Sequence, residues 1–303
     1  MPGERKFGQD NPYYDWVPVI KRSPLVWPNN ARVALAVIVN LEHWDWQLPA
    51  GEPGAPSGAF RPDIATFSQH EYGNRVGVFR IFKILDKYGI KPTIAMDKEV
   101  AENYPFLVRE VQRRNLEVIA HGTAPRRTIH DTMSVEEERA YIRSSIEAIA
   151  KAIGKRPIGW LGPGFQESMN TPNLLAAEGI RYVCDWANDE QPYRMKVQQG
   201  ELYSVGINLD LDDDYIHNTG GRLITEYADG IKDTFDAFYT DGAKYGRMMV
   251  INIHPWIMGW PWRSKHLDVA LAHIEKNGGT QVWKASGREI LDWYSTHENI
   301  ARA

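Results

Sequence analysis

The chain has 303 residues and a formal net charge of −4 at pH 7, and 43% of its residues are hydrophobic. This slightly acidic balance, without a basic stripe, argues against nucleic acid or an anionic membrane as the main partner. The single cysteine excludes an internal disulfide framework, the longest apolar run is too short to span a bilayer, and the N-terminus has no apolar signal core, so we expect a cytoplasmic protein. The length suits one catalytic domain over 1–303, with a core over about 31–294 and an N-terminal extension over 1–30.

Apolar runs that end in polar residues alternate with segments of helical periodicity along the whole chain. In chain order we predict strand 32–41, helices 76–88 and 101–114, strand 116–120, helix 135–153 after the N-cap Ser134, strand 158–161, helix 173–178, strand 181–184, helix 227–240, a strand that begins at Arg247 and ends on His254, and helix 265–276. This order of strand, polar terminus and helix is typical of a parallel sheet with crossover helices.

The residues just past the strands are the candidates for an active site, because the loops at the carboxyl ends of barrel strands carry the chemistry. They are Asn40, Glu42, His43 and Trp44 after strand 32–41, His121 after strand 116–120, Asp185, Trp186, Asn188 and Asp189 after strand 181–184, and His254 and Trp256 at the end of the last strand. The tryptophan rings at these positions either wall a dry pocket for a small molecule or serve ordinary packing.

Three of these residues have the chemistry of general acids or bases. Glu42, in a pocket walled by Trp44 and Trp46, would have a raised pKa and could act as a base, and the alternative is a solvated loop glutamate. His121 and His254 are either catalytic groups or structural histidines at strand ends.

Other polar stretches favour no particular chemistry. The acidic run Asp210, Asp212, Asp213 and Asp214 lacks the ligand spacing of an EF-hand loop, and we interpret it as a solvated turn. No phosphate-binding loop and no Gly-x-Ser-x-Gly elbow is present in the sequence. The segment 48–62, rich in proline and glycine, is either a long active-site loop or a surface insertion.

Several short motifs follow one another in a characteristic order. They are Asn40-Leu41-Glu42, E-Y-G-N-R-V-G-V-F-R over 71–80, Ala120-His121-Gly122, R-P-I-G-W over 156–160, the segment 185–193, and Ile253-His254 followed by Gly259, Pro261 and Arg263. Over roughly 31–294 the chain resembles the polysaccharide deacetylase superfamily, and more narrowly its branch of deacetylase-like allantoinases and cyclic imide hydrolases. The resemblance implies an α/β fold, a distorted (β/α) barrel of about seven parallel strands, and hydrolysis of an amide-type C–N bond.

The chain departs from the metal-binding pattern of the deacetylases it resembles. Those enzymes carry an Asp-Asp pair after the first strand and a His-x-x-x-His pair after the third, which together hold a divalent metal. Here the first strand offers Glu42 and His43, either of which could occupy the carboxylate position, and Pro125 stands where the second histidine would follow His121. We therefore favour no metal, although zinc could be held by Glu42, His43 and His121, with His130 as another possible ligand. Leu161 likewise replaces an arginine of the family pattern.

We expect a hydrolase that cleaves a C–N bond of a small ureide or imide, cyclic in form, and that assembles as a dimer or tetramer. In this assignment Glu42 activates water, His254 protonates the leaving nitrogen or stabilises the oxyanion, and His121 orients the substrate. Substrate contacts are assigned to Asn40, Trp44, Glu71, Tyr72, Arg75, Asp185, Trp186, Asn188, Asp189, Trp256 and Arg263.

Two features leave alternatives open. Arg75 could pair with Glu71 one helical turn away, and Gly73 and Gly77 could let the backbone approach a neighbouring chain or loop. The whole chain could also be a metal-dependent N-deacetylase acting on sugar or peptidoglycan, or a non-catalytic barrel that binds a small molecule.

Overall fold

The computed structural model describes residues 11–45 and 64–298, and its centre is a nine-stranded sheet. The strands are β1 (Val33–Leu41), β2 (Thr93–Met96), β3 (Glu117–Ala120), β4 (Gly159–Trp160), β5 (Tyr182–Val183), β6 (Tyr193–Met195), β7 (Leu202–Ser204), β8 (Arg247–Ile253) and β9 (Val282–Lys284). The predicted loop 48–62 and Trp46 lie outside the described residues.

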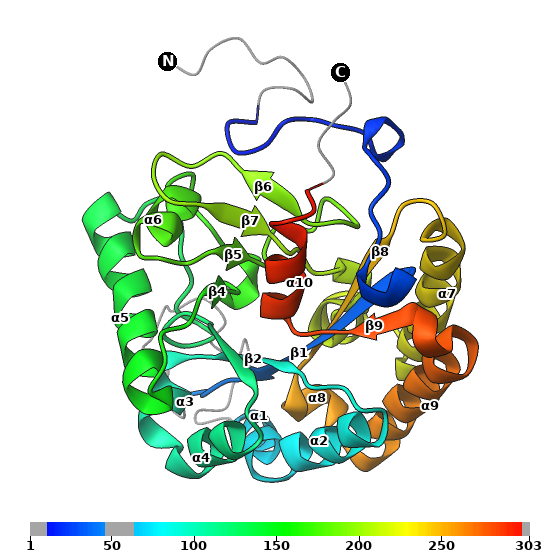
Figure 1. The fold of residues 1–303 in the computed structure, drawn as a ribbon. Coiled ribbons are helices and arrows are strands. Elements are labelled where there is room, and N and C mark those ends of the chain that lie inside the picture. Colours follow the sequence, from blue (N-terminus) through cyan, green and yellow to red (C-terminus); the bar gives the residue numbers. More distant parts are fainter. Residues whose placement is uncertain (1–10, 46–63, 299–303) are drawn as a thin grey trace.

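The strands lie in the order β6-β7-β5-β4-β3-β2-β1-β8, and β9 pairs with the first three residues of β1. All the pairings are parallel except the one between β6 and β7. The sheet curls into a half-barrel, which confirms the predicted fold class (Figure 1). The first and last long strands are neighbours, with Ile38 paired to Asn252 and Val39 to Ile253.

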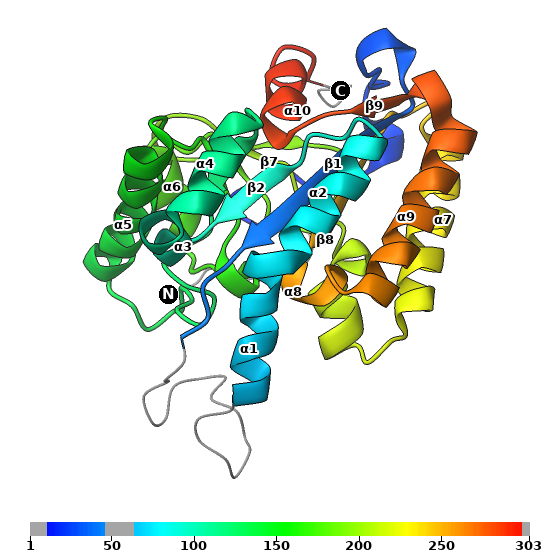
Figure 2. The same ribbon diagram turned by 90° about the horizontal axis from the view of Figure 1, so that it is seen from below.

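Most helices lie on the outside of the curled sheet, with α3, α4 and α5 on one side of β1 and α7 and α9 on the other (Figures 1 and 2). The exception is α10, whose buried residues pack with the inner-face residues of β1. Their bounds are α1 (Ile64–Tyr72), α2 (Val78–Lys87), α3 (Lys98–Asn103), α4 (Pro105–Arg113), α5 (Val135–Ile153), α6 (Thr171–Ala177), α7 (Ile224–Asp241), α8 (Pro255–Met258), α9 (Pro261–Gly278) and α10 (Gly287–Tyr294). Short 3₁₀ turns are η1 (Val19–Lys21), η2 (Pro28–Asn30), η4 (Pro163–Phe165), η5 (Leu209–Leu211) and η7 (Gly279–Gln281), and wider π turns are η3 (Gly73–Gly77) and η6 (Tyr215–Thr219).

Local sequence chemistry explains where helices begin and break. The predicted helix 135–153 has the bounds of α5, and its N-cap Ser134 forms a capping box with Glu137. The predicted helix 101–114 is instead divided into α3 and α4, because Pro105 donates no backbone N–H and disfavours the helical conformation at Tyr104. The predicted helix 76–88 likewise begins after η3, which joins it to α1.

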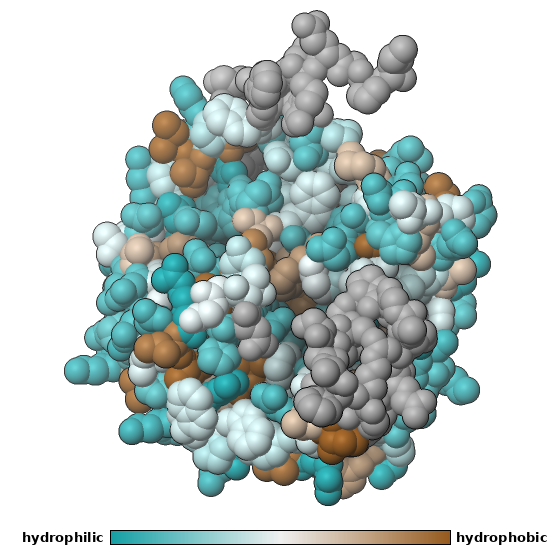
Figure 3. All heavy atoms as spheres, turned by 180° about the vertical axis from the view of Figure 1, so that it is seen from behind, coloured by the Kyte–Doolittle hydropathy of each residue, from teal (hydrophilic) through white to brown (hydrophobic). Residues whose placement is uncertain are grey.

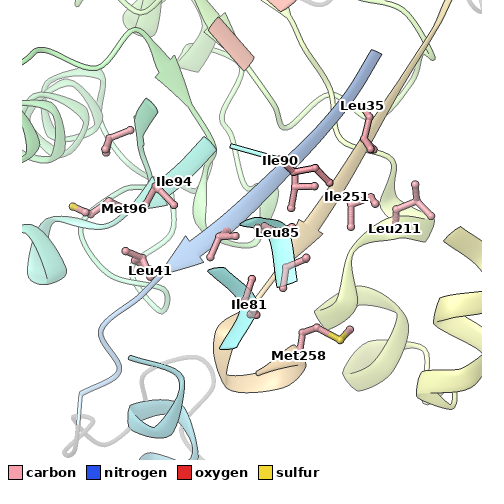
Figure 4. Packing of buried hydrophobic residues seen from close by; sticks show 14 of the residues in the cluster. Leu35, Leu41, Ile81, Leu85, Ile90, Ile94, Met96, Leu211, Ile251 and Met258 are labelled. Carbon is pink, nitrogen blue, oxygen red and sulfur yellow. The ribbon is translucent and has the colours of Figure 1, made fainter. Parts of the chain in front are cut away.

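The two faces of β1 carry different kinds of side chain. Leu35 and Leu41 face the helices, where they belong to one core cluster with Ile81, Leu85 and Met258 (Figure 4). The alternate residues over 34–38 are mostly alanine and point into the barrel, in a second cluster. Each fully buried leucine or isoleucine contributes about 1.5–3 kcal/mol relative to an exposed one, so the outer layer holds the strand in place. The small inner residues leave room for the polar groups at the strand's end.

Hydrophobic residues on the surface occur in small, separated patches among hydrophilic ones on the face shown in Figure 3. Scattered exposed apolar side chains of this kind need no partner to explain them, and the predicted dimer or tetramer stays a prediction. In the described part of the chain, the helices are all too short or too polar to cross a bilayer.

Close backbone packing between η3 and α8 explains the two glycines of the 71–80 motif. A Cβ atom at Gly73 would lie 2.6 Å from the backbone nitrogen of Trp256, and one at Gly77 would overlap the carbonyl oxygen of Pro255. Of the two roles considered for these glycines, the structure supports close approach to a neighbouring loop. That approach fixes the position of α8, which follows the last strand.

We predict that Gly77→Ala lowers the free energy of unfolding by about 1–3 kcal/mol, because the added methyl group would push η3 and α8 apart. Gly230→Ala is the matched control, since Gly230 lies within α7 and a Cβ there would meet no atom within 4 Å. That control should be neutral or slightly stabilising. Urea unfolding of both variants measures the difference, and equal stability would show that the close approach is not a packing constraint.

Candidate active site

Glu42 follows the end of β1 and points into the barrel, on the same strand face as Asn40. Its side chain is 7% exposed. The indole N–H groups of Trp44 and Trp256 both donate to its Oε2 atom, over 3.2 and 3.3 Å. The backbone oxygen of Glu42 accepts from the Asn74 amide at 2.8 Å. Donors from three separate parts of the chain therefore hold this carboxylate and its backbone in place.

Two histidines converge on the other carboxylate oxygen of Glu42. The Nε2 atom of His121, which follows β3, lies 3.2 Å from Oε1, and the Nε2 atom of His254, which follows β8, lies 3.8 Å from it. Each ring is oriented from behind through Nδ1: His121 donates to the carbonyl oxygen of Leu161 at 2.6 Å, and His254 pairs with Asp213 at 2.7 Å. The structure thus brings together the three residues predicted to be catalytic.

The prediction that 210–214 is a solvated turn is wrong for Asp212 and Asp213, which are 1% and 0% exposed. Asp213 accepts from both the backbone N–H and the ring of His254. Asp212 accepts from the amide of Asn252 at 2.6 Å, and Asn252 in turn accepts from Asn40 at 2.8 Å. The turn after η5 therefore folds back against the end of β8, where Asn252 and His254 supply donors to its two buried carboxylates.

The charges at the site stabilise one another. Burial alone raises the pKa of Glu42, but the charge of His254, together with the hydrogen bond and charge of His121, outweighs it and lowers the pKa to about 2. The expectation of a raised pKa for Glu42 is therefore wrong. Burial lowers the pKa of His254, but the charges of Glu42 and Asp213 outweigh it and raise this pKa well above its ordinary value. Burial raises the pKa of Asp213 to about 7 against the opposing charge of His254. At neutral pH an imidazolium at His254 thus lies between two acidic groups.

A stack of aromatic rings stands beside Glu42. The His70 ring stacks on Trp44 with the centroids 4.0 Å apart and lies 4.2 Å from the Trp256 centroid, while the Arg126 guanidinium lies 5.0 Å from the Trp44 ring. Burial lowers the pKa of His70 to about 4, so this ring is neutral and packs as an aromatic group. The sequence interpretation missed His70 and Arg126, because neither lies at a strand end.

The structure shows which of the two neighbouring residues, Glu42 or His43, faces the site. His43 turns away from the two histidines, with its Nδ1 atom 2.9 Å from the hydroxyl of Tyr104 and its Nε2 atom 3.4 Å from Asp45. Its backbone N–H donates to Asp97 at 2.7 Å. Glu42 is therefore the carboxylate that faces the site.

Residues of the 71–80 motif support the loops around the site. Glu71 accepts from the Tyr104 hydroxyl at 2.9 Å, and Arg75 is exposed. Tyr72 stacks on Trp260 with the centroids 4.0 Å apart. The predicted Arg263 is half-buried and donates to the carbonyl oxygen of Ile257 at 3.3 Å. These contacts place Tyr72 and Arg263 in the packing around α8 and Glu71 against Tyr104, between α3 and α4, while Arg75 has no assigned contact in the described structure.

The four predicted residues after β5 separate into two places. Asp185 accepts from the backbone N–H of Gly162 at 2.8 Å, and Trp186 donates to Glu167. Asn188 and Asp189 instead line a cavity of about 1100 Å³ whose walls do not include Glu42, His121 or His254. Asp189 forms an ion pair there with Arg22, from the N-terminal segment. The structure thus does not bring Asn188 and Asp189 to the carboxylate site.

The donors near Glu42 do not fit the metal site of the deacetylases. Glu42 and His121 offer two ligand atoms, His43 points elsewhere, and Pro125 has no donor, whereas a catalytic zinc usually has three protein ligands. Among the described residues, Asp212, Asp213 and His254 also have ligand atoms within 4.8 Å of one another, which makes them a possible acidic and histidine metal site. However, their facing atoms already hydrogen-bond to one another or to Asn252.

The sequence of this chain is similar to those of known deacetylases. A family model described as polysaccharide deacetylase matches residues 66–183. A putative polysaccharide deacetylase of Schizosaccharomyces pombe is 26% identical over 303 residues, which cover 89% of this chain and 93% of that protein. A peptidoglycan deacetylase of Helicobacter pylori is 28% identical over 154 residues, which cover 50% of this chain and 51% of that protein.

Solved structures give the same result for the fold. The crystal structure of Puue allantoinase matches with a TM-score of 0.77 and 26% identity, covering 89% of this chain and 93% of that one. A probable polysaccharide deacetylase from Pseudomonas aeruginosa matches with a TM-score of 0.78 and 24% identity, covering 90% and 94%. Together these likenesses show that the chain is similar to polysaccharide deacetylases and to an allantoinase.

We predict that Asp213→Asn moves the alkaline limb of the pH–activity profile to lower pH. The raised pKa of His254 keeps its imidazolium form above the ordinary range, and activity should be lost as the pH rises through that value. Removing one of the negative charges lowers the pKa, so the loss should begin earlier. Asp236→Asn is the control, because Asp236 pairs with the half-buried His273 in the same way, at 2.8 Å, away from the site. An unmoved limb in Asp213→Asn would contradict the assignment.

We also predict that the purified protein holds little tightly bound zinc and that its activity survives dialysis against a chelator. The reason is the incomplete ligand set around Glu42 and His121. Elemental analysis and assays with and without added metal test this. Stoichiometric zinc held by these two residues, or activity lost on chelation and restored by metal, would contradict this prediction and show that another residue completes the ligand set.

Proposed function

We propose that the chain hydrolyses a C–N bond of a small cyclic ureide or imide and belongs to the allantoinase-like branch of its superfamily. The observation that carries the proposal is the convergence of His121 and the His254–Asp213 pair on the buried carboxylate of Glu42, in a site without the deacetylase metal ligands. The likeness to an allantoinase structure is consistent with an amide substrate of this class.

The charge states of Glu42 and His254 suit the two proton transfers of amide hydrolysis. The reaction adds the oxygen of water to the carbonyl carbon and breaks the C–N bond, so one proton leaves the water and another must reach the nitrogen. Glu42 is ionised and accepts the proton from water, while the His254 imidazolium donates its proton to the leaving nitrogen. The imidazole of His254 then regains a proton from Glu42, which restores both groups.

The indole and histidine donors around Glu42 also favour a small substrate. Trp44 and Trp256 each place an N–H on the carboxylate and an apolar ring beside it, and a planar ring such as an imide or ureide could stack against such a surface. The substrate carbonyl would lie near His121 or His254, whose N–H groups can stabilise a developing oxyanion.

A metal-dependent N-deacetylase acting on sugar or peptidoglycan is the second candidate. The sequence likeness to the Schizosaccharomyces pombe and Helicobacter pylori proteins supports it as well as the allantoinase likeness supports the first candidate. The two functions differ in their need for metal. A turnover screen of cyclic ureides, cyclic imides and N-acetylated sugars, with metal-stripped and metal-supplemented protein, separates them. Release of acetate only with metal would replace the first proposal with the second, and ligand binding without any turnover would favour a non-catalytic barrel.

We predict that Glu42→Gln and His254→Ala each reduce turnover by about 10²-fold or more, the scale of losing a positioned acid or base. Because the two residues act together in the same proton transfers, the double variant should lose much less activity than the product of the single losses. Steady-state kinetics on the best substrate of the screen measures this, and Asp189→Asn serves as a control outside the site. A fully active double variant would remove both residues from the mechanism.

A further inference from the structure

Two acidic side chains behind the site take no part in the proton transfers described above. Asp185 follows β5, Glu167 follows η4, and a hydrogen bond joins their carboxyl groups. Two carboxyl groups can hydrogen-bond to each other only when one of them carries a proton. Their buried atoms Asp185 Oδ2 and Glu167 Oε1 have no N–H or hydroxyl donor among the described residues, so each depends on the other.

A single peptide group connects this acidic pair to His121. The N–H of Gly162 donates to Asp185 Oδ1 at 2.8 Å, and the C=O of Leu161 accepts from His121 Nδ1 at 2.6 Å. These N–H and C=O groups are the two ends of the same amide. A negative charge at Asp185 therefore polarises that amide and strengthens its oxygen as an acceptor for the histidine ring.

The backbone around the amide is arranged for this contact. A Cβ atom at Gly162 would lie 3.0 Å from Asp185 Oδ2, so a side chain at this position would crowd the carboxylate. On the other side, Gly122 has φ +64°, and a Cβ there would lie 2.7 Å from the ring of Pro163. The loop after β4 is thus pressed between the residue that follows His121 and the carboxyl group of Asp185.

We propose that Glu167 and Asp185 are positioning residues that orient His121 through the Leu161–Gly162 peptide group. The strengthened carbonyl accepts the Nδ1–H of His121 and so fixes the ring with its Nε2 atom facing Glu42. Glu167 keeps Asp185 in place by donating its own proton to it. As a part of hydrolysis this role rests on the proposed function, whereas the orientation of His121 does not.

The charge distribution agrees with this geometry. Burial raises the pKa of Asp185 to about 6, while the hydrogen bonds from Glu167 and Gly162 and the nearby His121 hold it down. Burial, followed by the charge of Asp185, raises the pKa of Glu167 well above its ordinary value. The shared proton therefore lies on Glu167, and the negative charge lies on Asp185, next to the amide.

The test uses the imidazole nitrogen and N–H proton signals of His121 in NMR spectra of ¹⁵N-labelled protein, assigned by their loss in His121→Asn. In Asp185→Asn we expect the Nδ1–H proton to shift and to exchange faster with water. Glu167→Gln should keep the wild-type signal, because the glutamine amide still donates to Asp185. Asp189→Asn, on the same loop but in the ion pair with Arg22, is the control and should change nothing.

Kinetics then connects the orientation to turnover. Asp185→Asn should lower kcat by about 10-fold to 100-fold with little change in KM, the range found for partners that orient a histidine from behind, and Glu167→Gln should recover most of it. An unchanged His121 signal in Asp185→Asn overturns the proposal. If that variant does not fold, Glu167→Ala must show the same spectral change or the proposal fails. Absence of turnover on every amide would remove the proposed function and leave the NMR result to stand alone.

Discussion

The burial of one ionised carboxylate, Glu42, is the constraint on which the site depends. A charged carboxyl group in the interior is stable only if it is paired and hydrogen-bonded, and removal of one partner leaves an uncompensated charge. Here two indole N–H groups and two imidazoles surround it. This compensation stabilises the fold above about pH 4.3, the ordinary value for glutamate, and is lost as the pH falls toward the lowered pKa of about 2.

The fold supplies those partners because parallel strands end at one rim. β1 lies between β2 and β8 in the sheet, and β3 is the next strand after β2, so the residues that follow β1, β3 and β8 meet although they are far apart in sequence. Trp256 comes from α8, whose position is fixed by the glycine contacts with η3. The large outer residues of β1 pack against the helices and stabilise the strand. Its small inner residues leave space for the polar groups of the site.

Strands β1, β3 and β8 and the residues that follow them at Glu42 could be predicted, because a long buried strand and its polar end are local signals. The short strands β2, β6, β7 and β9 were not predicted. Asp213 could not be predicted, since an acidic run in a turn looks solvated until its partner His254 is known to lie against it. Asn188 and Asp189 follow the same strand as Asp185, but the chain there turns toward Arg22, and no local pattern marks that turn. The choice of Glu42 over His43 could have been made from the sequence, because Glu42 shares its strand face with Asn40 and His43 does not.

The low pKa of Glu42 raises a question for the proposed hydrolysis, since a carboxylate so strongly stabilised is a weak base. The answer lies in its coupling to His254, whose charge is the largest of the favourable influences on Glu42. When the imidazolium gives its proton to the leaving nitrogen, that charge disappears and the pKa of Glu42 must rise. The carboxylate therefore becomes a better proton acceptor at the stage when the proton from water has to be held. In the proposed mechanism, the buried Glu42–His254 ion pair thus links the two proton transfers.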